Sequence, residues 1–223
     1  MKTVLVTGAN GGLGFSLTKA LLEQGYFVVA HYHMHKDLLE SLKEKYSESL
    51  YFLQGDVSLE SDVLQMRAEC EAVGIKVDAL VNNAAIDSLS ELEDKNKESF
   101  LRVFEVNTVG PFLMMKAFGS EINERWGSIV NISSDNTIDY YDMVSLEYDV
   151  SKAGLNLMTK TFANYFRQAH VNAILFDWLD TPMNDFTEEE KKYISFVPME
   201  RAVAKILEMI ETTETGRLEL MKE

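Results

Sequence analysis

Short apolar runs alternate along the chain with longer segments of mixed character. The first run, residues 3–7, is continuous and ends in a cluster of glycines, which is typical of a buried parallel strand entering a tight turn. Later runs of similar length share this composition. The predicted strands are residues 3–7, 27–32, 50–54, 78–82, 128–132, 171–176 and 217–221.

The segments between these runs carry apolar residues at helical spacing. The first such segment is closed by Gly25, a residue that often follows the end of a helix because it adopts left-handed backbone angles without strain. Helices are predicted at residues 17–25, 36–46, 59–73, 95–125, 147–168, 187–193 and 199–211. This alternation predicts right-handed crossovers and an α/β fold, a doubly wound parallel sheet of about seven strands with helices on both faces.

Composition adds limits on domain number and compartment. The chain has 223 residues, 46% of them hydrophobic, so residues 1–223 are expected to form a single domain around one substantial core. Cys70 is the one cysteine, which excludes an internal disulfide and fits a reducing cytoplasm. The sequence shows neither a signal peptide nor a run of roughly 18 apolar residues, so a cytoplasmic location is predicted.

Charge narrows the range of partners. With 36 acidic and 21 basic residues, the formal net charge is -15. Such a surface repels phosphate groups, so neither nucleic acid nor an anionic membrane is expected to bind. The sequence also shows no cluster of metal ligands, and no metal is expected.

The first strand is followed by the glycine turn TGANGGLG, residues 7–14. Glycine permits a sharp turn and lets backbone N–H groups approach a pyrophosphate, while the following helix directs its positive end at the phosphates. The turn therefore indicates a dinucleotide site, the alternative being a plain glycine-rich turn. The candidate cofactor-binding residues here are Gly8, Asn10, Gly12, Leu13 and Gly14.

The end of the second predicted strand bears on which dinucleotide binds. An acidic residue about 20 positions after the glycines usually grips the ribose 2′-hydroxyl of NAD. Here the first acid is Asp37, whereas His33, His35 and Lys36 are placed to meet the 2′-phosphate of NADP. NADP(H) is therefore predicted in preference to NAD(H), and an ordinary solvated loop is the alternative.

A Tyr148 and Lys152 pair, four positions apart, falls on one face of a predicted helix. A free tyrosine has a pKa near 10, and bringing it to pH 7 takes about 3 units, or roughly 4 kcal/mol of preference for the phenolate. A nearby ammonium supplies preference of that sign. The spacing alone is weak evidence, because exposed Tyr and Lys pairs are common on helices.

Three further motifs follow successive predicted strands, and together with the glycine turn and YDVSK they make the chain resemble the short-chain dehydrogenase/reductase family over residues 2–183. These motifs are Gly55-Asp56-Val57, Asn82-Asn83-Ala84-Ala85 and Ile132-Ser133-Ser134. Their order and spacing carry the resemblance more than any one of them does. The resemblance implies an NAD(P)-dependent oxidoreductase.

The resemblance also implies cofactor-binding roles. Asp56 would hydrogen-bond the adenine amino group with Val57 beside it, although an Asp at a strand end is often a helix cap. The family's NNAG motif lines the cofactor, and here Ala85 replaces its glycine. The further residues expected to line or contact the cofactor are Asn83, Ala84, Leu179, Thr181, Tyr148 and Lys152.

The catalytic roles are likewise inferred from the family. Ser134 would hydrogen-bond the reacting oxygen, with Ser133 as the alternative because Ser134 lies 14 residues before Tyr148, one more than usual. Tyr148 would be the general acid and base, and Lys152 would lower its pKa and bind the nicotinamide ribose. Asn107 would interrupt the long helix and hold a relay water, unless it is a satisfied core amide.

Two stretches depart from the family or add charge. Phe176-Asp177 stands where Pro-Gly is common, adding a Cβ and a negative charge near the expected pyrophosphate, which would displace the loop or weaken the cofactor's binding. The acidic loop at 135–147 is expected to border the substrate and to disfavour an anionic one, unless it is merely solvated. Its residues of note are Asp135, Asp139, Tyr140, Tyr141, Asp142, Met143 and Glu147.

The predicted function is hydride transfer between NADP(H) and a small carbonyl or alcohol substrate. The alternative is a dinucleotide-binding sensor or scaffold of the same fold with weak or no turnover. The resemblance further implies a homodimer or homotetramer formed through the helices at 95–125 and 147–168.

Overall fold

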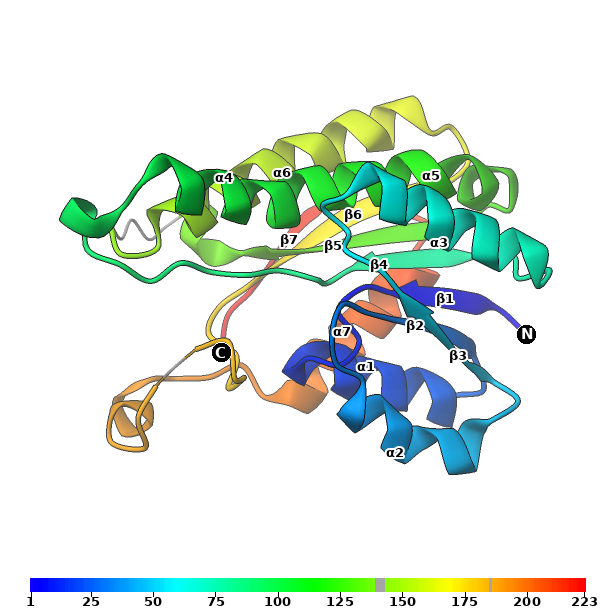
Figure 1. The fold of residues 1–223 in the computed structure, drawn as a ribbon, viewed down its shortest axis with the longest axis horizontal. Coiled ribbons are helices and arrows are strands. Elements are labelled where there is room, and N and C mark those ends of the chain that lie inside the picture. The colour runs from blue at the N-terminus through cyan, green and yellow to red at the C-terminus, as the bar shows by residue number, and fades with distance from the viewer. Residues whose placement is uncertain (139–142, 185) are drawn as a thin grey trace.

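A seven-stranded parallel sheet forms the centre of the computed structural model, which describes residues 1–138, 143–184 and 186–223 (Figure 1). The strand order is β3-β2-β1-β4-β5-β6-β7, and each neighbouring pair is parallel. The strands are β1 (Thr3–Val6), β2 (Phe27–Tyr32), β3 (Leu50–Gln54), β4 (Ala79–Asn82), β5 (Ser128–Ser134), β6 (His170–Phe176) and β7 (Leu218–Met221). The predicted α/β fold is confirmed.

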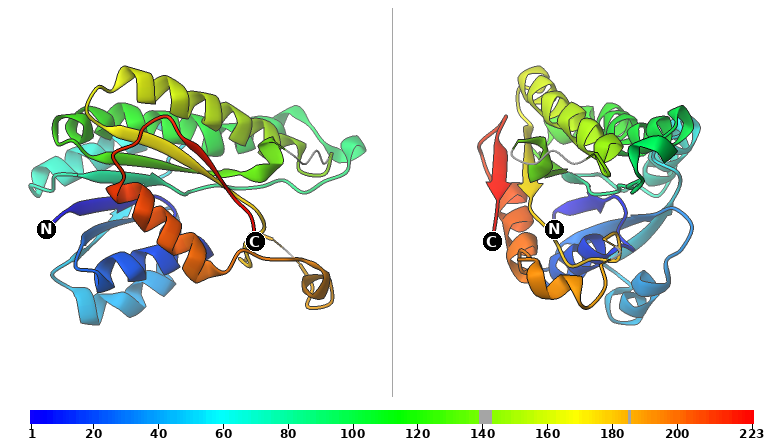
Figure 2. Two further views of the ribbon diagram at one scale, coloured as in Figure 1. Left: turned by 180° about the vertical axis from the view of Figure 1, so that it is seen from behind. Right: turned by 90° about the vertical axis from the view of Figure 1, so that its left-hand side faces the viewer.

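Helices cover both faces of this sheet (Figures 1 and 2). One face carries α1 (Gly12–Glu23), α2 (Asp37–Tyr46) and α7 (Met199–Glu211). The other carries α3 (Glu60–Ala72), α4 (Lys97–Phe104), α5 (Gly110–Glu124) and α6 (Leu146–Tyr165). Because helices bury both sides of the central strands, these strands are continuously apolar rather than alternating.

The direction in which successive strands are added to the sheet reverses between β1 and β4. From β1 the chain first builds β2 and β3 to one side, and then returns to place β4 to β7 on the other. Loops leaving the carboxyl ends of β1 and β4 therefore diverge and leave a crevice, which is where open α/β sheets bind ligands. This point of the sheet carries the site described below.

The predicted helix at 95–125 is divided in the structure. A 3₁₀ turn (Leu92–Asp94) precedes α4, and a π-helical turn, η2 (Glu105–Val109), separates α4 from α5. The π-helical turn contains the buried Asn107, whose side chain bonds to the Ile86 backbone and to Ser151 instead of facing solvent. Helical periodicity alone does not reveal such a division, since both halves share one apolar face.

Two other predicted helices are shorter than expected. The segment predicted as a helix at 187–193 forms only a 3₁₀ turn (Glu190–Tyr193), and α6 ends at Tyr165 rather than near 168. In the described part of the chain, no helix is long and apolar enough to cross a membrane.

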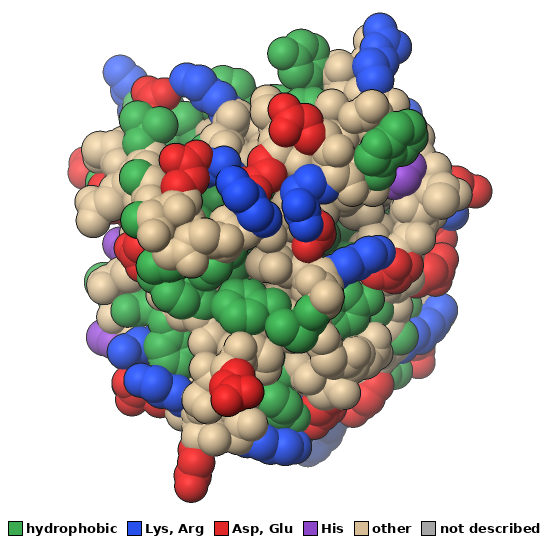
Figure 3. Space-filling view, turned by 90° about the vertical axis from the view of Figure 1, so that its right-hand side faces the viewer, with side chains coloured by type: hydrophobic (Ala, Val, Ile, Leu, Met, Phe, Trp, Pro, Cys, Tyr) green, Lys and Arg blue, Asp and Glu red, His purple; other side chains and the backbone are tan. Residues whose placement is uncertain are grey.

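The end of the molecule at the amino ends of the strands carries acidic and basic side chains next to one another (Figure 3). Pairs such as Arg125 with Asp78 and Lys2 with Glu211 belong to this mixed surface. Opposite charges that lie next to one another in this way offset one another locally.

Candidate active site

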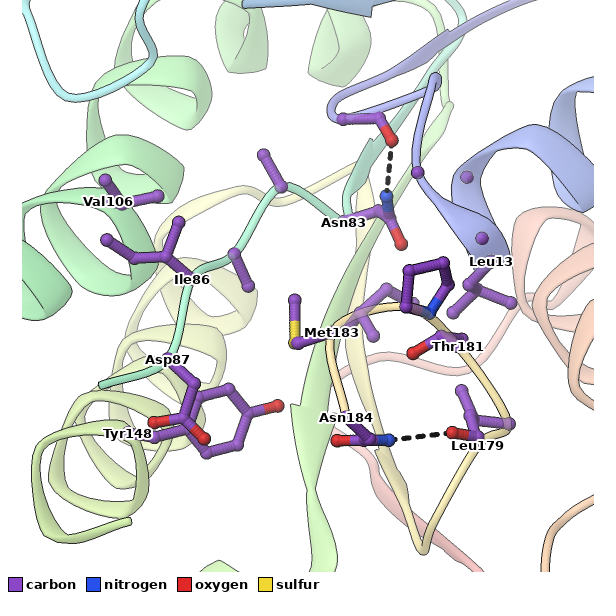
Figure 4. A pocket seen from close by; sticks show the side chains of 18 of the residues that line it. Leu13, Asn83, Ile86, Asp87, Val106, Tyr148, Leu179, Thr181, Met183 and Asn184 are labelled. Atoms are coloured by element: carbon purple, nitrogen blue, oxygen red, sulfur yellow. Dashed lines mark hydrogen bonds between the residues drawn. The ribbon is translucent and has the colours of Figure 1, made fainter. Parts of the chain in front are cut away.

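A cleft of about 560 Å³ lies at the carboxyl ends of the central strands (Figure 4). Its walls come from the turn between β1 and α1, the ends of β2, β4 and β5, the start of α6 and the segment after β6. All of the residues predicted from sequence to bind the cofactor except Lys36 line it, namely Gly8, Asn10, Gly12, Leu13, Gly14, His33, His35, Asp56, Val57, Asn83, Ala84, Ala85, Tyr148, Lys152, Leu179 and Thr181.

Gly12 and Gly14 in the glycine turn leave no room for a side chain. A Cβ on Gly14 would lie 2.2 Å from the Gly8 carbonyl oxygen, and one on Gly12 would lie 3.1 Å from the Thr181 side chain. Gly8 also has a φ of 64°, in the left-handed region that favours glycine. The bare backbone and the N-terminus of α1 therefore face the cleft, an arrangement that fits a pyrophosphate.

Hydrogen bonds hold the turn against the end of β4. The Asn83 side-chain amide donates to the carbonyl oxygens of Thr7 (2.8 Å) and Gly8 (3.2 Å). The Thr7 hydroxyl oxygen accepts from the backbone N–H groups of Asn83 and Ala84. Asn10 also has a local role, because its side-chain oxygen accepts from the N–H groups of Leu38 and Leu39 at the start of α2.

His31 is a further support of the turn that the sequence analysis did not identify. It is buried at the end of β2, where its Nδ1 accepts from the Gly8 N–H (3.1 Å) and its Nε2 lies 3.0 Å from the Gly55 carbonyl oxygen. These partners require the neutral tautomer with the proton on Nε2. Burial lowers the pKa of His31 to about 4, which keeps that neutral form at physiological pH.

At the far end of the cleft, three polar residues surround Asp56. Arg102 of α4 donates from Nη2 to Asp56 Oδ2 (3.0 Å) and from Nη1 to the Ser58 hydroxyl (2.7 Å), and His33 Nε2 lies 3.8 Å from Asp56 Oδ2. Burial opposes ionisation of Asp56, but hydrogen bonds from Ser58 and Arg102 lower its pKa below the usual value. Asp56 does not cap α3, whose N-terminal cap position is Leu59.

Arg102 was missed because it enters the cleft from a helix distant in sequence. Of the three predicted phosphate-binding side chains, His33 and His35 line the cleft. Lys36 points elsewhere, since its ammonium lies 3.3 Å from Glu40 and 5.3 Å from the centre of the Phe52 ring.

The two serines at the end of β5 have different partners. Successive strand residues point to opposite sides, and the Ser133 hydroxyl donates to the Lys152 carbonyl oxygen on α6 (3.5 Å). The Ser134 hydroxyl accepts from the Asn136 N–H (3.3 Å). Within the described part of the chain Ser134 acts only as an acceptor, so its proton is available to a ligand in the cleft.

Tyr148 and Lys152 lie one helical turn apart on α6. The Tyr148 hydroxyl points into the cleft, toward Met183 (Figure 4), and the Asp87 carboxyl lines the same cleft. The Lys152 ammonium is buried, donates to the Ile132 carbonyl oxygen (2.8 Å) and lies 5.3 Å from the centre of the Tyr148 ring.

The pKa of Tyr148 shifts upward in this structure, and the expectation that Lys152 lowers it stays a prediction. Burial, followed by the charges of Asp87, Asp149 and Asp135, raises the pKa of Tyr148 above its usual value. Burial also lowers the pKa of Lys152 to about 8, with Asp87 opposing this shift. The physical reason is that removal from water and three carboxylates outweigh one ammonium whose proton is directed at a carbonyl.

Asn107 is fully buried and its side chain is fully used. Its oxygen accepts from the Ile86 N–H (2.9 Å), and its amide donates to the Ile86 carbonyl oxygen (2.8 Å) and the Ser151 hydroxyl (3.0 Å). The side chain therefore fixes the segment after β4 against α6. Its predicted part in a proton relay stays a prediction.

Phe176 and Asp177, which stand where the family commonly has Pro-Gly, differ in their exposure to the cleft. Phe176 is buried at the end of β6, and Asp177 lines the cleft, with its carboxylate accepting from the Trp178 N–H (2.7 Å). Burial, and then the Asp177 charge, raises the pKa of Asp135. Asp177 therefore adds negative charge beside Asp135 instead of leaving bare backbone at the cleft.

The residues of the acidic loop at 135–147 differ in where they lie relative to the cleft. Asp135 lines the cleft, whereas Asp139, Tyr140, Tyr141 and Asp142 lie outside the described residues. Glu147 does not face the substrate region as expected, because it is buried in an ion pair with Lys95. Across residues 1–138, 143–184 and 186–223, no three His, Cys, Asp or Glu side chains gather as a metal site would require.

The fold and the cleft together define a Rossmann-like dinucleotide-binding protein, and comparison with known proteins gives the family. The chain matches the model of the short chain dehydrogenases over residues 2–192. It is 30% identical to an L-xylulose reductase of Caenorhabditis elegans over 210 residues, covering 90% of this chain and 82% of the relative. The chain belongs to the short-chain dehydrogenase/reductase family and is an NAD(P)-dependent oxidoreductase.

Other comparisons agree on family and fold. A 3-oxoacyl-[acyl-carrier-protein] reductase of Staphylococcus epidermidis is 30% identical over 209 residues, covering 90% of this chain and 85% of the relative. An apo SCOR enzyme from Clostridium thermocellum superposes with a TM-score of 0.86 over 99% of this chain and 90% of its own, at 23% identity. The latter similarity bears on the fold alone.

Proposed function

We propose that the chain is an NADP(H)-preferring reductase of small, neutral carbonyl compounds, with alcohol oxidation as the reverse reaction. The observation that carries the proposal is the Tyr148 hydroxyl, which points into the same cleft that the bare glycine turn faces. A proton donor and a pyrophosphate cradle in one cleft are what carbonyl reduction requires.

In the proposed reaction, Ser134, Tyr148 and Lys152 each have a separate role. Ser134 donates a hydrogen bond to the carbonyl oxygen, and Tyr148 delivers the proton to it. The raised pKa of Tyr148 supports this direction, because the phenol keeps the proton that it has to give. Lys152, fixed by the Ile132 carbonyl oxygen, holds positive charge beside the ring and offers a donor to the cofactor ribose. When bound, NADPH supplies the hydride.

The preference for NADP rests on basic side chains that lie near the end of β2. His33 and His35 line the cleft there, and Arg102 contributes a guanidinium group held against Asp56. Arginine and histidine donors suit a phosphate, and a guanidinium suits it best.

Arg102→Ala tests this preference. We expect the Kd for NADPH to rise about tenfold, as the loss of one charge-assisted contact implies, while the Kd for NADH changes less than about twofold. Lys36→Ala is the matched control, since Lys36 points away from the cleft. Nicotinamide fluorescence titration provides the measurement, and an equal loss of both cofactors would contradict the assignment.

The proposed substrate is neutral because the cleft is acidic around the reacting groups. Asp87, Asp135 and Asp177 all line it, and a bound anion would meet unfavourable charge there. The named relatives act on different carbonyl compounds, so the panel should include xylulose, a 3-oxoacyl thioester and simple ketones.

The decisive experiment combines binding and turnover. Saturable binding of NADPH together with oxidation of NADPH by at least one carbonyl on the panel is the expected result. Binding without turnover on any of them would favour the alternative, a dinucleotide-binding sensor or scaffold, and absence of binding would exclude both functions.

We also propose that the chain forms a homodimer or homotetramer through α4, α5 and α6. Large apolar side chains remain exposed on these helices, namely Leu101, Phe112, Val150, Leu157 and Tyr165. Light scattering on the purified protein should give two or four times the mass of 25.3 kDa, and a monomer would contradict the proposal.

A further inference from the structure

A buried ion pair lies next to the catalytic tyrosine in the sequence. The side chains of Lys95 and Glu147 are 8% and 0% exposed, and the ammonium contacts the carboxylate directly. Lys95 Nζ also donates to the Val144 carbonyl oxygen (2.9 Å), and the Ser99 hydroxyl donates to Glu147 (3.4 Å). Since an isolated buried charge is strongly unfavourable, each member depends on the other.

The pair joins two segments that both border the cleft. Glu147 is in the first turn of α6, directly before Tyr148. Lys95 ends a strap, residues 87–95, that begins directly after Ile86, whose backbone is held by Asn107. The strap is therefore tied at both ends, at its start to η2 and at its end to the N-terminus of α6.

The strap carries Asp87 into the cleft that Tyr148 also lines. Asp87 lines the cleft and accepts from the Ser88 N–H (2.6 Å). Burial raises the pKa of Asp87; Lys95 lowers this pKa and Glu147 raises it. Asp87 in turn raises the pKa of both Tyr148 and Lys152, so the ion pair reaches the catalytic residues through space as well as through the backbone.

We propose that Lys95 and Glu147 are positioning residues that fix the strap and the first turn of α6 so that Tyr148 and Asp87 keep their places in the cleft. This inference rests on the proposed function of Tyr148 as the acid. A neutral pair holds these segments together without adding net charge beside the phenol.

The electrostatic consequence has a definite sign. The charged groups acting on Tyr148 are Asp87, Asp149 and Asp135, with Lys152 beside its ring. In Lys95→Met the Glu147 carboxylate is unpaired, which disfavours the phenolate. In Glu147→Gln the Lys95 ammonium is unpaired, which favours it. The two substitutions therefore move the ionisation of Tyr148 in opposite directions.

The test uses the full-length protein, the panel carbonyl with the highest turnover and its alcohol. Alcohol oxidation requires the phenolate, so kcat for this direction falls at low pH. In a plot of kcat against pH, we expect the midpoint of this fall to move about half a pH unit upward in Lys95→Met and about half a unit downward in Glu147→Gln. We expect kcat to fall roughly tenfold in each, as a small displacement of a catalytic group implies, with the Kd for NADPH within about twofold of the parent.

A double variant and a surface control complete the design. Lys95→Met/Glu147→Gln buries no unpaired charge, so this double variant provides the test if the single variants do not fold. In the double variant we expect the plot of kcat against pH to have the same midpoint as in the parent protein, while kcat itself stays low. Lys116→Met/Glu60→Gln removes an exposed pair, 58% and 57% exposed, and should leave kcat and the pH profile unchanged.

The possible failures are separable. If the parent protein turns over no carbonyl on the panel, the proposed function fails and the inference fails with it. If the parent is active and a folded double variant keeps its kcat, or only the melting temperature falls, the positioning role is overturned while the proposed function stands.

Discussion

At the scale of single residues, burial sets the protonation of the two groups at the centre of the cleft. Tyr148 holds its proton above the usual pKa, and Lys152 titrates at about 8, so both carry a proton at pH 7. A protonated phenol beside a carbonyl is ready for reduction. Alcohol oxidation by the proposed mechanism needs the phenolate, so we expect it to run at higher pH or against a larger barrier.

Tyr148→Phe isolates this proton. The variant removes one hydroxyl from a side chain whose oxygen faces the cleft, so we expect kcat to fall by about 10²- to 10⁴-fold. The Kd for NADPH should stay within about threefold, because the ring remains. Steady-state kinetics and fluorescence titration measure the two quantities; near-full turnover in the variant would refute the role given to Tyr148.

His31 gives a prediction about stability in acid. Its pKa is about 4 in the folded protein and near 6.5 when unfolded, so the unfolded chain binds the extra proton first as the pH falls. The contribution is complete above pH 6.5 and is lost between 6.5 and 4, by up to about 3 kcal/mol.

His31→Gln provides the comparison, since its amide can still donate and accept but does not titrate. Urea unfolding at several pH values should show a flatter dependence on pH for the variant. Carboxylates titrate in both proteins and cancel in the difference. Parallel pH dependences would show that His31 is not buried in its neutral form.

At the scale of elements, the turn between β1 and α1 has the tightest geometry. A Cβ at position 14 would lie 2.2 Å from the Gly8 carbonyl oxygen, whereas the nearest atom to one at position 11 is 3.4 Å away, an ordinary contact. Gly14→Ala must therefore shift the turn, and Gly11→Ala need not.

We expect Gly14→Ala to weaken NADPH binding by about tenfold or more, because the displaced backbone no longer meets the pyrophosphate. Gly11→Ala should stay within about threefold. Fluorescence titration of both variants, with thermal unfolding to confirm that each is folded, makes the comparison. Equal Kd values would mean that the turn does not contact the cofactor.

Elements with a strong local pattern of apolar residues were predictable from the sequence. The predicted ranges of β2, β3 and α7 agree with the structure at both ends, because continuous apolar runs or strong helical periodicity mark them. The sequence analysis expected Asn107 to interrupt the long helix, but it did not predict where α4 ends and α5 begins. This division depends on how Asn107 bonds to Ile86, a contact across 21 positions that no periodicity records.

The residues that hold the cleft in shape were less predictable from the sequence than the residues that line it. Gly8, Ser134 and Tyr148 belong to short motifs that can be recognised locally. His31 acts through Gly8 and Gly55, Arg102 through Asp56, and Lys95 through Glu147. Each partner is 23 to 52 positions away, so these roles appear only once the chain is folded.

At the scale of the whole molecule, two apolar clusters share one sheet. One packs α1, α2 and α7 against it and includes Leu17 and Ile206; the other packs α3, α5 and α6 and includes Met66 and Phe118. Neither cluster can be exposed without opening the strands that also bury the other. The two clusters should therefore unfold together, as expected of the single domain proposed from chain length.

Two tryptophans allow this to be checked. Trp126 lies just before β5, at the amino ends of the strands, and Trp178 lies just after β6, at their carboxyl ends. The fluorescence of each therefore reports on a different end of the strands. Fluorescence of Trp126→Phe and Trp178→Phe variants and far-ultraviolet circular dichroism should give coincident unfolding curves in urea. Separate midpoints would show that the two ends unfold independently.

Because β1 pairs with β2 on one edge and with β4 on the other, its two edges are covered at different times during synthesis. β2 is available to pair with β1 soon after it, but the other edge of β1 waits for β4, which begins at Ala79. An open strand edge invites pairing with other chains. At about 5–20 residues per second, the ribosome needs roughly 2 to 10 s to travel from Tyr32 to Ala79. During that interval, a nascent chain has to shield the edge of β1 with its own helices or with a chaperone.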